Sequence, residues 1–293
     1  MIKFLDSVVR KVSRGRHALR RQTILKIGLV VVFLFILTTG LTQIKGLTPY
    51  HTTKYRDAPR LQGPSLQHLM GTDQLQRDVF SRIISGGKAS LIVAFGAVAL
   101  SMTVGSILGW ISGFAGGFLD RALSLTMDAI YSFPSMILAI VLVAMFGAGI
   151  GPMVWAVGFV YIPTYFRVTR AEVLTVRETT YVEAIRAVGA SNLRIILRHV
   201  APNTVNAIMA VSSFNLADAI LTVAALSFLG FGLPPPAPDW GFDIQNGQKY
   251  LQSGSWWLIT FPGLMIIALS LGFGLIGEGI SDLVNPKRKR KRV

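Results

Sequence analysis

Long apolar stretches without a charged residue alternate along this chain with short polar segments. Charge-free windows cover residues 27–44, 89–119, 129–166 and 250–277. Each window is at least as long as the roughly 18–20 residues that a helix needs to cross a bilayer. The 129–166 window is too long for one helix and contains GAGIGP at 147–152, a typical helix break. A further apolar run, 203–231, is interrupted only by Asp218.

This pattern predicts an all-α integral membrane protein with six transmembrane helices. The expected spans are 24–44, 89–115, 122–147, 152–176, 203–230 and 257–280. The chain then divides into a basic N-terminal segment (1–23), the first helix with an external loop (24–88), a five-helix core (89–286) and a basic tail (287–293). Composition agrees, because 52% hydrophobic and 15% charged residues are too apolar for a soluble domain of 293 residues.

The distribution of Lys and Arg predicts the orientation in the membrane. Most of them lie in residues 1–26, 167–198 and the tail KRKRKR at 287–292. Basic connections face the cytoplasm, so we expect both termini and the 177–202 segment there. The external 45–88 loop is itself net positive and departs locally from this rule. The first apolar run is expected to be an uncleaved helix, since no A-x-A-type cleavage site follows it.

The net charge of +15 and the residue types limit the possible chemistry. The basic surface suits anionic lipid head groups, whereas nucleic-acid binding would leave the apolar spans unexplained. The chain has no Cys, and its four His lack metal-site spacing. GGKA at 86–89 is only superficially a phosphate loop, because Arg82 stands where Gly is required and Ala89 where Ser or Thr is required. We therefore expect no catalytic residue, metal or cofactor in this chain.

Glycines inside the apolar spans are expected to serve helix packing. GFGLIG at 272–277 matches the G-x-G-x-x-G dinucleotide pattern but lies within an apolar span, with no strand before it. Small residues allow membrane helices to approach closely. The same role is expected for Gly105 and Gly109.

The segment 181–203, YVEAIRAVGASNLRIILRHVAPN, carries an unusual number of charges for this chain. Thr180 and Glu183 have the spacing of a capping box. An apolar repeat follows at Val182, Ile185 and Val188. The pattern predicts a short amphipathic helix that ends at Gly189, where glycine permits a left-handed backbone.

A second short helix is predicted directly afterwards. Ser191 can cap it, and Pro202 is expected to bar its simple continuation into the next span. Arg194 and Arg198 share one face. The apolar face is expected to contain Leu193, Ile196, Leu197 and Val200. Residue patterns alone allow such a helix pair to lie flat on lipid or to enter a groove of a partner protein.

The spacing of this segment resembles the EAA loop of the membrane subunits of ABC importers. That pattern is E-A-A, three residues, G, nine residues and I-x-L-P. Glu183, Ala184, Gly189 and Pro202 stand in register. The sequence departs from the pattern at Ile185, His199 and Ala201.

Other blocks are similar to the same subfamily. GTDQLQRDVFSRIISGGKASL at 71–91 resembles its G-T-D-x-x-G-R-D block, with Gln76 where Gly is usual. AALSFLGFG at 224–232 and PPPAPDWG at 234–241 resemble the end of the fifth helix and the loop after it. From about residue 20 to 286 the chain resembles the second, C-type permease subunit of dipeptide and oligopeptide ABC importers.

The resemblance implies a type I ABC importer permease fold with a cytoplasmic coupling helix, in the cytoplasmic (inner) membrane of a bacterium or archaeon. It implies as partners a second homologous permease, two cytoplasmic ATPase subunits and an extracytoplasmic substrate-binding protein. ATP and magnesium would be bound by the ATPase subunits, so this chain would be non-catalytic. The residues implied in ATPase coupling are Glu183, Ala184, Arg186, Gly189, Arg194, Arg198 and Pro202.

The expected substrate pathway is centred on Asp218, about halfway along the fifth predicted span, together with Asn215 and Thr222. A carboxylate at the bilayer centre costs roughly 2.5–3.5 kcal/mol, so Asp218 should face a wet cavity, a partner or a hydrogen-bonding helix interface. A peptide's terminal amine is one possible counter-charge. The loop 233–257 is expected to form an external cap, with Trp256 and Trp257 as interfacial anchors, and the resemblance implies that it meets the binding protein.

The leading function is therefore one half of the translocation pathway of an ATP-driven importer of di- and oligopeptides. Importers of nickel or other metal chelates and of oligosaccharides remain alternatives within the family. A self-sufficient secondary transporter would need inverted repeats and ionisable coupling residues. The sequence has no repeat of the 181–203 segment and only one central acid.

Overall fold

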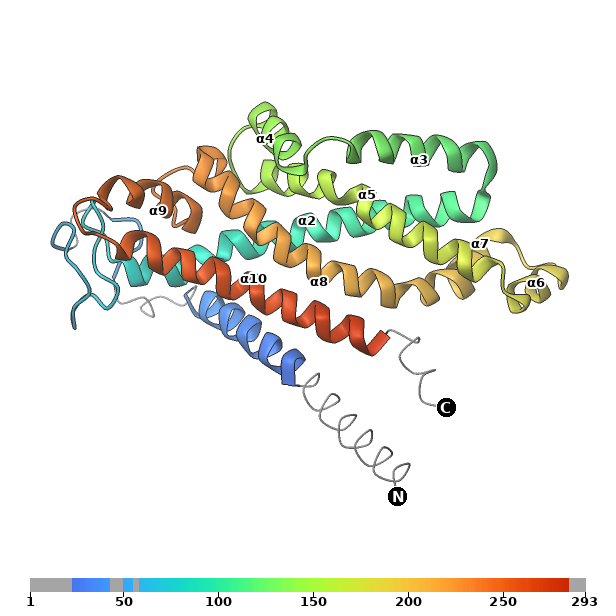
Figure 1. Ribbon diagram of the computed structural model, residues 1–293, viewed down its shortest axis with the longest axis horizontal. Coiled ribbons are helices and arrows are strands. Elements are labelled where there is room, and N and C mark those ends of the chain that lie inside the picture. Colours follow the sequence, from blue (N-terminus) through green and yellow to red (C-terminus); the bar gives the residue numbers. More distant parts are fainter. Residues whose placement is uncertain (1–22, 43–49, 55–57, 285–293) are drawn as a thin grey trace, which may run out of the picture.

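The computed structural model describes residues 23–42, 50–54 and 58–284, in which the regular elements are helices and no strand occurs (Figure 1). The predicted basic segments at the two ends lie almost entirely outside these residues. The α-helices are Thr23–Leu41, α2 (Val79–Ala115), α3 (Gly117–Tyr131), α4 (Ser135–Phe146), α5 (Ile150–Arg177), α6 (Thr180–Ala187), α7 (Asn192–Ile195), α8 (Ala201–Leu226), α9 (Trp240–Gly247) and α10 (Trp257–Val284).

Four helices in the described ranges are long and apolar enough to cross a membrane, and a fifth span results if α3 and α4 are counted together. The four are Thr23–Leu41, α2, the continuous helix Asn192–Phe231 and Trp257–Ser281. α5 is 28 residues long but contains several charged residues and is not among them. The all-helical membrane class is thus confirmed, whereas the count of six spans stays a prediction.

The second span begins earlier than the predicted residue 89. α2 starts at Val79, because the Asp78 side chain accepts a hydrogen bond from the Ser81 backbone N–H and caps the helix. Arg82 and Lys88 made this first part look too polar for a span. Arg82 is nevertheless 2% exposed in the structure, because its charge is paired with the carboxylate of Asp243, which lies far away in the sequence.

The predicted single span 122–147 is wrong in detail, because two helices cover it. α3 and α4 meet at an angle of 88°. Pro134 stands directly before α4, and a proline disfavours helical backbone at the residue that precedes it. The helix therefore ends at Tyr131 and restarts at Ser135.

The prediction that Pro202 separates the coupling segment from the fifth span is also wrong. The chain is helical from Asn192 to Leu226 without a break at Pro202. A π-helical turn, η1 (Ile196–Val200), precedes α8, and Pro202 occupies its first turn. Proline is accommodated there because the π turn directly before it rearranges the backbone hydrogen bonds that the missing N–H would otherwise have to make.

The core forms where α2, α5, α8 and α10 run side by side along the molecule (Figure 1). Close contact of α2 with α5 depends on glycines, as predicted for Gly105 and Gly109. A Cβ atom would lie 2.6 Å from the Ile162 carbonyl oxygen at Gly105 and 2.8 Å from the Phe166 carbonyl oxygen at Gly109. α9 and the residues before α2 lie at one end of the molecule, and α6 and α7 at the other.

Packing by the GFGLIG glycines is confirmed at two of three positions. A Cβ atom at Gly272 would lie 3.0 Å from Val31, and one at Gly277 would lie 3.2 Å from the Phe214 ring. Gly274 has open space around it in this single chain. The motif thus serves the contacts of α10 with the first helix and with α8.

Candidate functional site

The EAA-type segment forms a compact hairpin at one end of the molecule, made of the short helix α6 and the beginning of the long helix that starts at Asn192. α6 ends at Ala187, Gly189 has φ of +85°, and α7 follows Ser191. The predicted left-handed glycine is therefore confirmed. All seven residues expected to couple to the ATPase are exposed in this chain, namely Glu183, Ala184, Arg186, Gly189, Arg194, Arg198 and Pro202.

The predicted capping interactions do not form. Thr179, and not Thr180, is the N-cap of α6, and neither its side chain nor that of Ser191 makes a capping hydrogen bond. The Thr179 hydroxyl instead donates to the Val176 carbonyl oxygen at 2.6 Å. The hydroxyl thus serves the end of α5, where carbonyl groups lack helical partners.

The apolar faces also differ from the predicted ones. Val182, Ile195 and Val200 are buried against Val173 of α5. Val188 is 88% exposed, because α6 ends before it. Leu193 and Leu197, which belong to the predicted apolar face, are 66% and 59% exposed in this chain. The π turn explains the shift, since its wider spacing aligns residues five apart.

An open groove of about 420 Å³ separates the two short helices. It is lined by Ala184, Ile185, Val188, Gly189, Ala190, Arg194 and His199. Three of the predicted coupling residues meet there, while the other four lie outside it. The hairpin is also tied to α2, because the Arg186 guanidinium lies 5.5 Å from the Phe114 ring centroid.

Asp218 lies on an exposed face of α8 and accepts a hydrogen bond from a residue of α5. The hydroxyl of buried Tyr161 donates a hydrogen bond of 2.6 Å to Asp218 Oδ2 and lies 3.3 Å from the Thr222 hydroxyl. A hydrogen bond to a charged group contributes about 1.5–3 kcal/mol, which offsets much of the cost of a carboxylate at this depth. The side-chain amide nitrogen of Asn215 makes no hydrogen bond within the described part of the chain.

Sequence reasoning missed Tyr161. Nothing local distinguishes it from other aromatic residues in the apolar run of α5. Its role follows from the packing of α5 against α8, which brings it to Asp218 from 57 residues away. Of the three predicted pathway residues, Asp218 and Thr222 therefore share one partner, and Asn215 stands apart from them.

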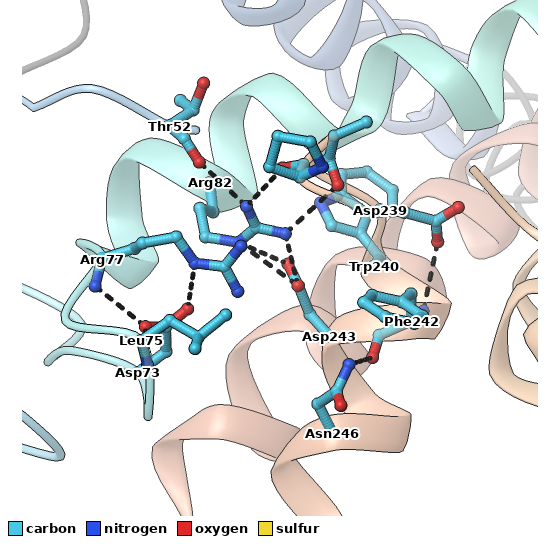
Figure 2. Close-up of polar contacts among 12 residues, drawn as sticks. Thr52, Asp73, Leu75, Arg77, Arg82, Asp239, Trp240, Phe242, Asp243 and Asn246 are labelled. Atoms are coloured by element: carbon cyan, nitrogen blue, oxygen red, sulfur yellow. Dashed lines mark hydrogen bonds and ion pairs between the residues drawn. The ribbon is translucent and has the colours of Figure 1, made fainter. Parts of the chain in front are cut away.

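The opposite end of the molecule is organised by Arg82 (Figure 2). Its guanidinium binds the Asp243 carboxylate through Nη2 at 2.6 Å and Nε at 3.2 Å. It also donates to the carbonyl oxygens of Thr52, Pro236 and Ala237 at 2.9, 3.2 and 3.3 Å. One buried cation thus joins α2 to α9 and to two loops, which confirms a folded cap in the 233–257 region.

A neighbouring ion pair completes this polar cluster. Arg77 Nε lies 2.6 Å from Asp73 Oδ2, and both side chains are buried (Figure 2). Asp243 is 16% exposed. Burial raises the pKa of the Asp243 carboxyl, and the Arg82 guanidinium opposes that shift.

The side chain of Trp240, a residue of the cap, is buried in the helical core. Its ring is 1% exposed, and Nε1 donates to the Ile83 carbonyl oxygen at 2.8 Å. A Cβ atom at Gly86 would lie 2.8 Å from this ring, and one at Gly87 would lie 3.0 Å from it. The glycines of the GGKA segment thus make room for an indole.

The prediction of two interfacial tryptophans is wrong for Trp257. Trp256 is 49% exposed, but Trp257 is 8% exposed and donates from Nε1 to the Thr72 carbonyl oxygen at 3.1 Å. Trp257 packs with Val79 and Ile83 of α2. It therefore holds the 58–78 segment onto α10 instead of facing the membrane surface.

Long apolar helices, a capped end and an exposed helical hairpin at the other end define a membrane transport subunit. The chain matches the family described as "binding-protein-dependent transport system inner membrane component" over residues 105–290, and it belongs to that family. It is a multi-pass inner-membrane protein. Permeases of this kind work with ATPase and substrate-binding proteins.

Among its relatives is the dipeptide transport system permease protein DppC of Alkalihalophilus pseudofirmus, 36% identical, with 95% of this chain and 91% of the relative covered. The glutathione transport system permease protein GsiD of Pectobacterium atrosepticum is 36% identical, with 94% and 90% covered. The probable D,D-dipeptide transport system permease protein DdpC of Escherichia coli is 37% identical, with 80% and 78% covered. The predicted resemblance to ABC importer permeases is confirmed.

Proposed function

We propose that this chain is one of two homologous permease subunits of an ATP-driven importer of di- and oligopeptides. The observation that carries this proposal is the exposed hairpin around Gly189, whose apolar residues are anchored on α2 and α5. The named substrates of three relatives, dipeptides, D,D-dipeptides and glutathione, support peptides as the cargo.

The proposed topology has six spans with both termini in the cytoplasm. α5 and the bent pair α3 and α4 would each form one span, in addition to the four longer apolar helices. The hairpin would then lie in the cytoplasm and serve as the coupling helix. Two ATPase subunits would bind ATP and magnesium, so this chain would supply neither a catalytic residue nor a cofactor site.

The coupling helix would act as a rigid lever. Val182, Ile195 and Val200 fix the hairpin to the end of α5, so a displacement of its exposed face would move the membrane helices as well. Glu183, Ala184, Arg186, Gly189, Arg194, Arg198 and Pro202 would form the contact with the ATPase. At the other end, the cap around Arg82 and Trp240 would meet the substrate-binding protein, and Asp218, Asn215 and Thr222 would line the path between. Lipid head groups would contact the basic segments.

Substitutions in the hairpin test this proposal. Gly189→Val places a β-branched side chain at φ of +85°, and Glu183→Lys reverses a charge on the exposed face. Either change should abolish dipeptide uptake by the reconstituted complex and reduce co-purification of the ATPase, with normal membrane insertion. Gly254→Val is the matched control for ATPase co-purification, which it should leave unchanged, because Gly254 has φ of +84° and open space but lies in the cap at the other end of the molecule. Normal uptake together with normal ATPase association in the hairpin variants would refute the proposal.

A further inference from the structure

The Asp218 carboxylate is exposed on a helix that is apolar and long enough to span a membrane. An ionised side chain in such a helix does not face hydrocarbon, so its open side must face water or another polar group. Within the described ranges Asp218 forms no ion pair, and its only hydrogen-bonded partner is Tyr161. No basic side chain within the described ranges therefore compensates the charge of this carboxylate.

From this geometry we propose that Asp218 binds the ammonium group of the transported substrate and that Tyr161 positions the carboxylate for it. The inference rests on the proposed function, since a peptide with a free amino terminus carries such a group. It adds the chemical group recognised inside the membrane and the residue that recognises it.

The donors and acceptors fit an ammonium group. Tyr161 donates to Oδ2 of Asp218, while Oδ1 accepts no hydrogen bond from the described part of the chain. A primary ammonium has three donors and no acceptor, so it matches a free carboxylate oxygen. The Thr222 hydroxyl, one helical turn further along α8, can supply a second acceptor.

The same arrangement disfavours other ligands. A substrate carboxylate would be repelled by Asp218, for which the site holds no basic partner. Calcium takes 6–8 oxygen ligands, several of them carboxylates. Across the described residues no group of three or more His, Cys, Asp or Glu could hold a metal ion, and the site has a single carboxylate. A metal ion without its own chelator would therefore find too few ligands here.

Tyr161 acts through Asp218. Its side chain is 7% exposed and rigidly packed in the core, so its hydroxyl fixes which carboxylate oxygen is occupied. The second oxygen is left pointing away from that bond. Removal of the hydroxyl should weaken substrate capture without removing the charge.

Dipeptide uptake by the complete reconstituted complex tests the assignment. A peptide α-amino group has a pKa of about 7.7–8.0, so an alanyl-alanine probe is largely charged at pH 7 and largely neutral at pH 9. We expect Asp218→Asn to raise the apparent KM for uptake roughly tenfold or more at pH 7. The ratio of variant to wild type should approach one at pH 9. Because both proteins use the same binding protein, its own pH dependence cancels in this ratio.

Three further variants separate recognition from structure. Asp218→Glu should keep most of the uptake and its dependence on the amine charge. Tyr161→Phe should change KM in the same direction as Asp218→Asn but less. Asp128→Asn is the matched control, because it removes a carboxylate that is 59% exposed and paired with Arg167, and it should leave KM unchanged.

The outcomes are distinguishable. A loss at pH 7 that disappears at pH 9 supports the ammonium site. An equal loss at both pH values, or no loss, overturns it, since Asp218 would then be structural or idle. If Asp218→Asn fails to assemble, the same comparison of pH 7 with pH 9 in Tyr161→Phe decides, because that variant weakens substrate capture without removing the carboxylate. If the wild-type complex takes up no dipeptide at all, the proposed function fails and this inference falls with it.

Discussion

Arg82 of α2 and Asp243 of α9 are 161 residues apart in the chain, yet they form an ion pair with contacts of 2.6 and 3.2 Å. Arg82 is 2% exposed, and its remaining donors bind backbone carbonyl oxygens of two loops. The pair therefore fixes the cap to the first turns of α2. Loss of one partner leaves the other charge buried without compensation.

We expect Arg82→Leu to lower the free energy of unfolding by about 3–5 kcal/mol, the usual result of breaking a buried pair. The double variant Arg82→Leu, Asp243→Leu should be less destabilised than the single one. Arg167→Leu is the control, because its pair with Asp128 is largely exposed and worth at most about 1 kcal/mol. Thermal unfolding of the full chain in detergent measures all three. Equal losses for Arg82→Leu and Arg167→Leu would contradict this account.

The stability of the Arg82→Leu variant should also depend more strongly on pH than that of the wild type. Burial raises the pKa of Asp243 in the folded protein above its unfolded value, and Arg82 opposes this rise. A group with a raised folded pKa favours folding at low pH, and this contribution is lost as pH rises through the folded pKa. The midpoint temperature of thermal unfolding should therefore decrease as pH is raised from 4 to 7, and this decrease should be steeper in the variant than in the wild type. The same slope in both would show that Arg82 does not control this carboxyl.

Gly109 permits the contact between α2 and α5. A Cβ atom there would lie 2.8 Å from both the Phe166 carbonyl oxygen and the Thr169 Cβ. Gly109→Ala should destabilise the isolated chain by about 1–3 kcal/mol through overpacking. Gly274→Ala is the matched control, since no atom lies within 4 Å of its Cβ position, and it should gain about 0.5–1 kcal/mol from helix propensity. Detergent-phase unfolding curves compare the two, and similar effects would argue against close packing at Gly109.

Val188 offers an apolar contact on the hairpin. It is 88% exposed and lines the groove with Gly189 and Arg194. We expect Val188→Asp to reduce ATPase co-purification several-fold, because a charge would be buried without a partner in the docked complex. Val188→Leu should retain normal co-purification of the ATPase. Thermal stability of the subunit should not change in either variant, so a loss of stability with Asp would point to misfolding instead.

The long helices were predictable because a long run of apolar residues by itself indicates a membrane-spanning helix. Charge-free windows, together with the apolar run that only Asp218 interrupts, located every long helix, and Gly189 was assigned to a left-handed position that the structure has. The start of α2 was not predictable from local sequence. Its first turns contain Arg82 and Lys88, and the burial of Arg82 there depends on its ion pair with Asp243.

The candidate site was predictable to a similar, limited degree. The exposed positions of the EAA-type segment followed from its spacing, but its apolar faces did not. The π turn before α8 changes the register, so Ile195, which was not assigned to the apolar face, is buried beside Val200, whereas Leu193 and Leu197 of that face are exposed. Tyr161 could not be found beside Asp218, because only the packing of α5 on α8 brings them together.

Trp257 and Trp256 are adjacent in sequence but should differ in their effect on stability. Trp257 is buried and donates to the Thr72 carbonyl oxygen, whereas Trp256 is 49% exposed. Trp257→Phe removes the donor and leaves a buried carbonyl unsatisfied, which should cost about 1–3 kcal/mol. Trp256→Phe should stay within about 0.5 kcal/mol of the wild type. Unfolding in detergent and limited proteolysis of the 58–78 segment measure the difference. Equal effects would support the interfacial role for both residues, whereas protection of this segment in Trp256→Phe alone would support the role of Trp257 in the cap.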